Sequence, residues 1–351
     1  MEILSKVWRG TKRLRDNLSA REEIQYVTEG SNWVIQEIGQ RLQNHLGKDR
    51  VGMTVMPVGF RNKVIHYGSA ATFFEKHQHF PLVKGNNRII VTWFHVVPDH
   101  SYPSFDRLKG LVDLWHTSNQ SSVKALVQLG IPEEKICLIP IGVDRAFQVK
   151  SSKKEKETLR RKWEVPLEAT VIGSFQKDGT GWGEGNEPKL VKGPDVFCDV
   201  MEVLAREIDL FVLLSGPARG YVKKRLSQAN IPFLHHQFQH PTELVNFYQM
   251  LDQYLIASRV EGGPIQLMES MASGIPVVST AMGMPLDYVQ SGENGLLSPV
   301  GDIAAIAKAC LGLVHDSSLA ESITQKARQT VEPLYWDMIF KDYLTKLYQR
   351  G

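Results

Sequence analysis

The chain has 351 residues, more than one hydrophobic core comfortably holds, which predicts two domains. A content of 42% hydrophobic and 23% charged residues is typical of a soluble globular protein, and a formal net charge of +3 gives no reason to expect a nucleic-acid partner. No apolar run approaches the ~18–20 residues that span a bilayer, and a signal-peptide core is lacking, so we expect a cytoplasmic location. The scattered Cys137, Cys198 and Cys310 are expected to be buried reduced thiols.

Residues 1–21, MEILSKVWRGTKRLRDNLSAR, place apolar side chains near one helical face and basic side chains over most of the remainder. Such a helix fits peripheral contact with an anionic membrane, here the inner membrane face. Gly10 weakens the helix, however, and packing on the first domain explains the same apolar stripe. We expect packing and keep peripheral membrane contact as the alternative.

In the first half of the chain, candidate strands and helices alternate, which predicts parallel α/β layers. The expected strands are 24–28, 51–56, 64–67, 88–94, 112–115 and 135–139, with helices over 32–46 and 119–129. The run PIGVD at 140–144 and the polar stretch after it indicate a domain boundary followed by a surface helix.

The second half repeats the alternation. The expected strands are 170–175, 209–215, 232–236, 252–257 and 275–280, and the helices between them lie near 194–207, 219–229, 241–250 and 264–273. Three further helices, near 302–314, 317–331 and 335–349, close the chain. The fold class predicted is therefore α/β, with two Rossmann-like halves.

The most informative stretch is EGGPIQLMESMASGIPVVST at 261–280. A helix is expected to begin near Pro264 and to end at Gly274 with a left-handed cap, before a buried strand. Glu269 then lies on the helix and Glu261 on the loop before it, and both can face a group docked at the helix N-terminus, where free N–H groups favour an anion. An anion with a carboxylate on each side suits a nucleotide sugar, whose hydroxyls the carboxylates would bind.

This segment strongly resembles the glutamate–seven residues–glutamate motif of retaining glycosyltransferases with the GT-B fold, the GT4 family in particular. The stretch MGMPLDYVQSGENGLLSPVGD at 282–302 resembles that family's usual continuation. The resemblance implies a GT-B fold of two Rossmann-like domains with parallel sheets facing a central cleft. An acceptor-side domain would cover 1–147, with the helix at 333–351 crossing back to it, and a nucleotide-sugar domain would cover 148–332.

The resemblance also implies roles for individual residues. Glu261 would hold sugar hydroxyls, Glu269 would bind the ribose diol, and backbone N–H groups near Gly262 and Gly263 would stabilise the diphosphate. In the glycine-rich loop after strand 170–175, the Lys192-Gly193 pair matches the family's lysine that neutralises the leaving diphosphate. Ser174 stands where the family usually has an arginine, and Lys177 either takes its place or is an exposed loop lysine.

Two residues of the first half complete the expected site. His95 ends the strand IIVTWFH and resembles the family's histidine that contacts the donor sugar near the reacting carbon. Gly30 lies in the first strand-to-helix turn, which borders the acceptor and diphosphate in the family, although a simple helix cap by Ser31 or Asn32 explains that turn equally.

We expect no metal and no cofactor, because no Asp-x-Asp pair occurs and HHQFQH at 235–240 lacks a recognisable set of partner ligands. The function predicted is a retaining, metal-independent transfer of a sugar from a nucleotide-diphosphate sugar to a glycan, lipid or other hydroxyl acceptor. The alternatives are another GT-B activity, such as a nucleotide-sugar epimerase or sugar phosphorylase, and a non-catalytic sugar-nucleotide-binding protein.

Overall fold

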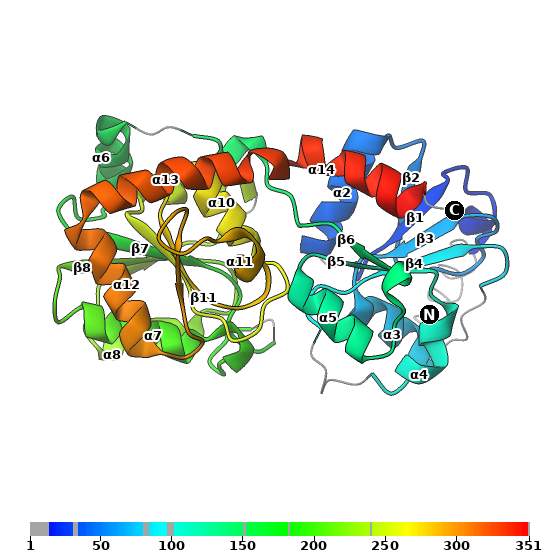
Figure 1. Ribbon diagram of the computed structural model, residues 1–351, viewed down its shortest axis with the longest axis horizontal. Helices are drawn as coiled ribbons and strands as arrows, with labels where there is room; N and C mark the ends of the chain where they lie inside the picture. Colours follow the sequence, from blue (N-terminus) through cyan, green and yellow to red (C-terminus); the bar gives the residue numbers. More distant parts are fainter. Residues whose placement is uncertain are drawn as a thin grey trace, which may run out of the picture. The chain divides into compact units, whose positions relative to one another are not determined.

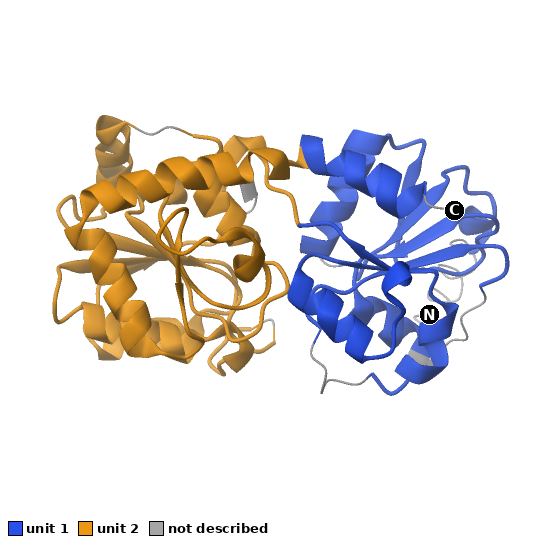
Figure 2. Ribbon diagram, in the orientation of Figure 1, with its two compact units in different colours: residues 1–140, 337–351 blue, residues 141–336 orange. Residues whose placement is uncertain are grey.

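The computed structural model describes residues 14–30, 34–79, 84–96, 102–149, 152–181, 183–238 and 241–349. It forms two compact units, the first made of residues 1–140 and 337–351 and the second of residues 141–336 (Figure 2). The boundaries fall near, but not at, the expected 147/148 and 332/333. The two connecting segments pair with each other, because the backbone N–H of Val143 donates to Leu334 and that of Trp336 donates to Val143, each at 3.0 Å.

The first unit is built on a six-stranded parallel sheet in the order β2-β1-β3-β4-β5-β6 (Figure 1). Its strands are β1 (Ile24–Val27), β2 (Val51–Thr54), β3 (Val64–Tyr67), β4 (Arg88–Thr92), β5 (Leu114–Thr117) and β6 (Ile136–Leu138). All six were expected, and β5 starts two residues later than predicted. Just before it, Asp113 bonds to Ile89 twice: its backbone N–H donates to the Ile89 carbonyl at 2.9 Å, and its carboxylate accepts from the Ile89 N–H at 2.8 Å.

Helices cover both faces of this sheet. They are α2 (Val34–Leu46), α3 (Ala70–His79), α4 (Phe105–Leu108) and α5 (Gln120–Gln128). We did not predict α3 and α4, whose Phe73, Phe74 and Phe105 belong to an aromatic core with Trp93 and Trp115. The predicted cap of α2 by Ser31 or Asn32 falls outside the described residues.

The C-terminal segment packs on the first unit through α14 (Trp336–Asp342) and a π-helical turn over Tyr343–Tyr348. Phe340 stacks on His45 of α2 with ring centroids 3.9 Å apart. The apolar side chains of this segment are half-buried at Leu344 and buried at Tyr335, Trp336, Ile339, Phe340, Tyr343, Leu347 and Tyr348.

A buried chain of hydrogen bonds runs from this segment across the sheet. Its atoms are Tyr348 Oη, His66 Nδ1 and Nε2, Thr92 Oγ1, His116 Nδ1 and Nε2, and the Ile139 carbonyl, joined by bonds of 2.8, 2.7, 2.8 and 3.0 Å. The carbonyl only accepts, so His116 Nε2 donates to it. Burial lowers the pKa of both imidazoles, which keeps them neutral, and every bond then points one way, from Tyr348 toward Ile139.

The second unit also has a six-stranded parallel sheet, in the order β12-β11-β10-β7-β8-β9. Its strands are β7 (Thr170–Phe175), β8 (Leu210–Ser215), β9 (Phe233–His235), β10 (Gln253–Ile256), β11 (Val277–Thr280) and β12 (Leu296–Ser298). The sequence did not predict β12, whose three residues show no alternation of their own. Helices α7 (Pro194–Leu204), α8 (Gly220–Gln228) and α12 (Ile303–His315) pack together in the main core of the unit.

On the other face lie α6 (Lys153–Lys162), α10 (Ile265–Ser273) and α13 (Ser317–Val331) (Figure 1). Helix α9 (Val245–Met250) contacts both α6 and α10. A short helix that we did not predict, α11 (Gly283–Tyr288), follows β11. The predicted α/β class with two Rossmann-like units is confirmed.

Over the described parts of the chain, we find no single helix whose length and hydropathy suit a membrane crossing. The helical segments Ile303–His315 and Ser317–Leu334 meet the criteria only as a pair, and they are bent by 101° relative to each other.

Candidate functional site

The sheet of the second unit has a point where its strand order reverses. Chain order runs β7, β8, β9 toward one edge and β10, β11, β12 toward the other, so β7 and β10 are neighbours whose following loops diverge. In open α/β sheets, ligands bind in the crevice outside the carboxyl ends of the strands at such a point. The glycine-rich loop after β7 and the segment after β10 both begin there.

The two segments are tied together at Lys192. Its carbonyl accepts hydrogen bonds from the side chains of Gln176, at 3.3 Å, and Ser258, at 3.4 Å. The backbone N–H groups of Arg259 and Val260 both donate to Val191, at 2.9 and 3.1 Å. The loop that carries Lys192 is therefore held against the segment that leads to Glu261.

Lys192 and Glu261, predicted separately as diphosphate and sugar ligands, form an ion pair in which Lys192 Nζ donates to Glu261 Oε2. The Glu261 side chain is only 6% exposed and that of Lys192 17%, so the pair is largely shielded from water. A partly desolvated pair is screened less by salt than one at the surface, and each charge needs a partner at all times.

Gly193 gives Lys192 its position. It adopts a left-handed conformation, with φ +63°, between the 3₁₀ turn Leu190–Lys192 and the start of α7 at Pro194. A Cβ atom at this position would collide with the carbonyl of Ala257, directly after β10. Only glycine allows the turn to lie this close to the strand end, which is why Lys192 reaches Glu261.

Glu269 lies on α10 and is 5% exposed, as unusual for a carboxylate as the burial of Glu261. Its Oε2 accepts a hydrogen bond of 2.8 Å from the hydroxyl of Tyr248, on α9. On the same helix, the apolar side chains of Met268, Met271 and Ala272 are buried, while that of Ile265 is half-buried.

The N-terminus of α10 has the predicted character. The helix begins at Ile265, after Pro264, and no side chain caps its first N–H groups. Gly262 and Gly263 come directly before Pro264. Gly274 ends the helix with the expected left-handed cap at φ +70°. The carbonyl of Glu261 lies so close to Gly283, the first residue of α11, that a Cβ there would collide with it.

Lysines gather around Glu261. Lys177 is half-buried in the loop after β7, and its charge is close enough to lower the pKa of Lys189. Lys189 is exposed as a whole, and the partial desolvation of its amine is the first cause of that lowered pKa; the charge of Lys192 adds to the shift and Glu261 opposes it. Lys189 was not predicted, because nothing in the sequence PKLVKG distinguishes it from a surface lysine.

A second unpredicted feature is the buried pair of Asp178 and Arg219. Their side chains are 1% and 0% exposed, and Arg219 Nε lies 3.1 Å from Asp178 Oδ1. Nη1 of Arg219 donates to the carbonyls of Ser174 and Ser215, at 2.8 and 3.2 Å, which clamps the ends of β7 and β8 together. Thus the guanidinium group beside Ser174 comes from Arg219, just before α8, and holds the loop in shape. Burial raises the pKa of Asp178, while the charges of Arg219 and Lys192 oppose that shift.

His95 and Gly30 belong to the first unit. His95 follows the end of β4 and is exposed, and the indole of Trp93 donates to its carbonyl at 2.8 Å. Gly30 follows β1 in a left-handed conformation, with φ +83°, and its N–H donates to the Thr28 hydroxyl at 3.3 Å. Both lie at carboxyl ends of strands, the edge where such sheets bind ligands.

The described histidines of the HHQFQH stretch contact a backbone carbonyl and aromatic rings. His235 Nε2 lies 2.9 Å from the Gly216 carbonyl, His236 packs edge-on to Trp163 and Phe238, and His240 is outside the described residues. Within the residues that the structure describes, His, Cys, Asp and Glu side chains do not gather in groups of three or more suited to a metal.

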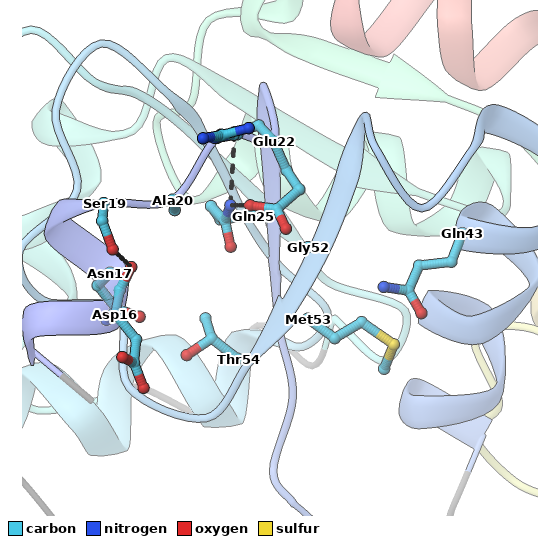
Figure 3. A pocket seen from close by; sticks show the side chains of 11 residues that line it. Asp16, Asn17, Ser19, Ala20, Glu22, Gln25, Gln43, Gly52, Met53 and Thr54 are labelled. Atoms are coloured by element: carbon cyan, nitrogen blue, oxygen red, sulfur yellow. Dashed lines mark hydrogen bonds between the residues drawn. The ribbon is translucent and has the colours of Figure 1, made fainter. Parts of the chain in front are cut away.

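The first unit contains an open recess of about 570 Å³ beside its edge strand β2 (Figure 3). Gln25, 3% exposed, lies across Gly52 there and donates to the Glu22 carboxylate at 3.3 Å. None of the residues predicted to bind a donor lines this recess, whose walls are formed by Asp16, Asn17, Ser19, Ala20, Arg21, Glu22, Gln25, Gln43, Gly52, Met53 and Thr54.

Known proteins resemble this chain in sequence and in fold. Residues 188–330 match the family of glycosyl transferases group 1. The capsular polysaccharide biosynthesis glycosyltransferase CapM of Staphylococcus aureus is 29% identical over 110 residues, 31% of this chain and 29% of CapM. N-acetyl-alpha-D-glucosaminyl L-malate synthase of Bacillus anthracis is 28% identical over 160 residues, 43% of this chain and 41% of the synthase. HepE of Anabaena, solved in complex with UDP-glucose, superposes with a TM-score of 0.74 at 17% identity and covers 93% of this chain and 99% of its own.

The two parallel sheets and the likeness to HepE define the fold as GT-B. The residues that match the glycosyl transferases group 1 family, 188–330, lie within the second unit, which carries Lys192, Glu261 and Glu269. The chain spans less than half the length of the two curated relatives named above.

Proposed function

We propose that this protein is a retaining, metal-independent glycosyltransferase of the GT4 type that uses a nucleotide-diphosphate sugar. The observation that carries the proposal is the meeting of Lys192, Glu261 and the start of α10 at the strand-order reversal of the second sheet, with Glu269 buried on the same helix. One cation, the backbone N–H groups of a helix N-terminus and two sequestered carboxylates match the charges and hydroxyls of such a donor.

Donor binding exchanges the partners of the ion pair. The diphosphate takes Lys192 together with the N–H groups before α10, in a region near Gly262 and Gly263, and sugar hydroxyls take Glu261. Glu269 accepts hydrogen bonds from the ribose diol. Lys192 and Glu261 each give up their partner in the ion pair and gain another from the ligand, so no charge is left buried alone.

Breaking the anomeric bond places positive charge on the sugar and negative charge on the departing diphosphate. Lys192 stabilises the diphosphate, with Lys177 and Lys189 adding positive potential around it. Gly193 contributes by holding Lys192 in place. On the first unit, His95 orients the sugar near its reacting carbon, and the Gly30 turn borders the acceptor.

The acceptor is proposed to be a glycan or lipid-linked hydroxyl group. CapM is named for capsular polysaccharide biosynthesis, and the similar WcaL of Escherichia coli, 24% identical over 306 residues, for colanic acid biosynthesis. We propose a cytoplasmic location and no resident cofactor or metal. A vesicle co-sedimentation assay with phosphatidylglycerol would test the alternative that residues 1–21 add peripheral membrane contact. In the described part of that segment, Asn17 donates to the Met56 carbonyl at 2.8 Å, and Leu18 is 57% exposed.

The decisive chemistry test follows product configuration. The protein is incubated in EDTA with UDP-, GDP- and ADP-linked hexoses and N-acetylhexosamines and with simple glycan acceptors, and the anomeric signals of the product are read by NMR. The proposal predicts turnover in EDTA with retained configuration. An inverted product or recovery only on adding a divalent metal would overturn those parts of it. Phosphate-dependent turnover, or a product formed without acceptor, would select the sugar phosphorylase or epimerase alternative. Donor binding without any turnover would select the non-catalytic sugar-nucleotide-binding alternative.

A further inference from the structure

We propose that Tyr248 is a positioning residue for Glu269 and that it sets how strongly the site prefers nucleotides with an intact ribose diol. This inference rests on the donor role proposed for Glu269. Tyr248 is 0% exposed and therefore does not touch the donor itself. Its effect passes through the 2.8 Å hydrogen bond that its hydroxyl donates to Glu269 Oε2.

The direction of this bond is fixed. An ionised carboxylate only accepts hydrogen bonds, and the hydroxyl is the donor. Burial first, and the neighbouring charge of Glu269 second, raise the pKa of the phenol far above its usual value, so the proton stays on Tyr248. The bond is charge-assisted, a class roughly twice as strong as bonds between neutral groups.

The ring that carries the hydroxyl is held on two sides. Phe147 packs edge-to-face against it with centroids 5.5 Å apart, and Phe175, at the end of β7, does the same at 4.9 Å. A donor held by such packing fixes the rotation of the carboxylate that accepts from it. The plane of the Glu269 carboxylate, and so the direction in which it meets ribose hydroxyls, follows from the position of Tyr248.

Tyr254 provides a matched control in the same cluster. It is 2% exposed and packs against both Phe175 and Tyr248, with centroids 5.4 and 5.7 Å away. Its hydroxyl, however, accepts a 2.7 Å hydrogen bond from the backbone N–H of Phe175. The Tyr254→Phe change removes a buried hydroxyl from this core without removing the bond to Glu269.

The experiment compares UDP with 2′,3′-dideoxy-UDP by calorimetry, or the corresponding pair for GDP or ADP if a donor panel selects that base. The wild-type protein should prefer the nucleotide with the diol. Tyr248→Phe should weaken binding of that nucleotide about tenfold and leave binding of the dideoxy nucleotide unchanged. A hydrogen bond to a charged group is worth ~1.5–3 kcal/mol, and a tenfold change in affinity corresponds to ~1.4 kcal/mol. Tyr254→Phe should keep the wild-type ratio.

If the role of Tyr248 is purely structural, Tyr248→Phe will weaken the binding of both nucleotides equally, and that result overturns the inference. Glu269→Gln separates the inference from the proposed function. If this variant keeps the wild-type preference, the donor role of Glu269 is wrong and the inference falls with it. If it loses the preference while Tyr248→Phe keeps it, Glu269 binds the diol but Tyr248 does not position it.

Discussion

Lys192 and Glu261 stand 69 positions apart in the chain and are joined by an ion pair at the carboxyl edge of the second sheet. The two principal charges of the site are therefore held against each other. A donor must offer negative charge to one and hydrogen-bond donors to the other, and a nucleotide-diphosphate sugar offers both.

The ion pair predicts that a second substitution can restore the stability lost in a Lys192 variant without restoring donor binding. Lys192→Ala leaves the Glu261 carboxylate, 6% exposed, without its cation, and should lower the free energy of unfolding by about 1–3 kcal/mol. Adding Glu261→Gln removes the stranded charge and should restore most of that loss in urea unfolding. Donor binding should stay weak in both variants. A double variant that binds donor as tightly as the wild type would contradict the assignment.

Gly193 should tolerate no side chain. Gly193→Ala combines the cost of a left-handed conformation, about 1–2 kcal/mol, with a collision against the Ala257 carbonyl, so stability and donor affinity should both fall. Gly301 is the control, because it has a similar φ of +77° but open space around it. Gly301→Ala should cost only the conformational part and leave donor binding unchanged. Equal losses of stability in the two variants, measured by thermal unfolding, would show that the close approach to Ala257 does not matter.

These features show what the sequence could and could not reveal. The strands other than β12 were predicted because apolar runs such as those of β7 and β10 are bounded by polar or glycine-rich loops. The order of the strands in each sheet could not be predicted from the residues, because pairing between distant segments leaves no local pattern. The sequence thus indicated Lys192 and Glu261 as separate candidates, while their contact depends on β7 and β10 being neighbours. Tyr248 and Arg219 carried no signal, since each looks like an ordinary residue of its segment until its partner is known.

The buried pair of Asp178 and Arg219 should be essential for the shape of the second unit. Arg219→Met leaves an uncompensated carboxylate that is 1% exposed and removes the clamp between β7 and β8, a loss of about 3–5 kcal/mol in denaturant unfolding. Changing Asp178→Leu as well removes the stranded charge and should recover part of that stability. An Arg219→Met protein within about 1 kcal/mol of the wild type would contradict a clamping role.

The hydrogen-bond chain through His66 and His116 predicts an acid-sensitive first unit. Burial lowers the pKa of His116 to about 4, although its bond to Ile139 opposes the shift, whereas an unfolded histidine titrates near ~6.5. The unfolded chain therefore binds more protons below pH ~6.5. The stabilising contribution is complete above that pH and is lost as the pH falls toward about 4.

We expect the free energy of unfolding to fall more steeply from pH 7 to pH 5 in the wild type than in His116→Asn, even though the variant is less stable at pH 7. Nitrogen NMR should show protonated Nε2 and unprotonated Nδ1 on both rings. Equal pH slopes, or the opposite tautomer at either ring, would contradict the one-way chain.

The most direct test of the donor site is thermal stabilisation by a panel of nucleotide sugars, measured in parallel on wild type, Lys192→Ala and Glu269→Gln. At ~100 times its dissociation constant, a donor that binds only the folded protein stabilises it by about 2.7 kcal/mol. The proposed donor site predicts that at least one nucleotide sugar raises the melting temperature of the wild type and that both variants lose most of this shift. Full shifts in both variants, or no shift with any donor, would contradict it.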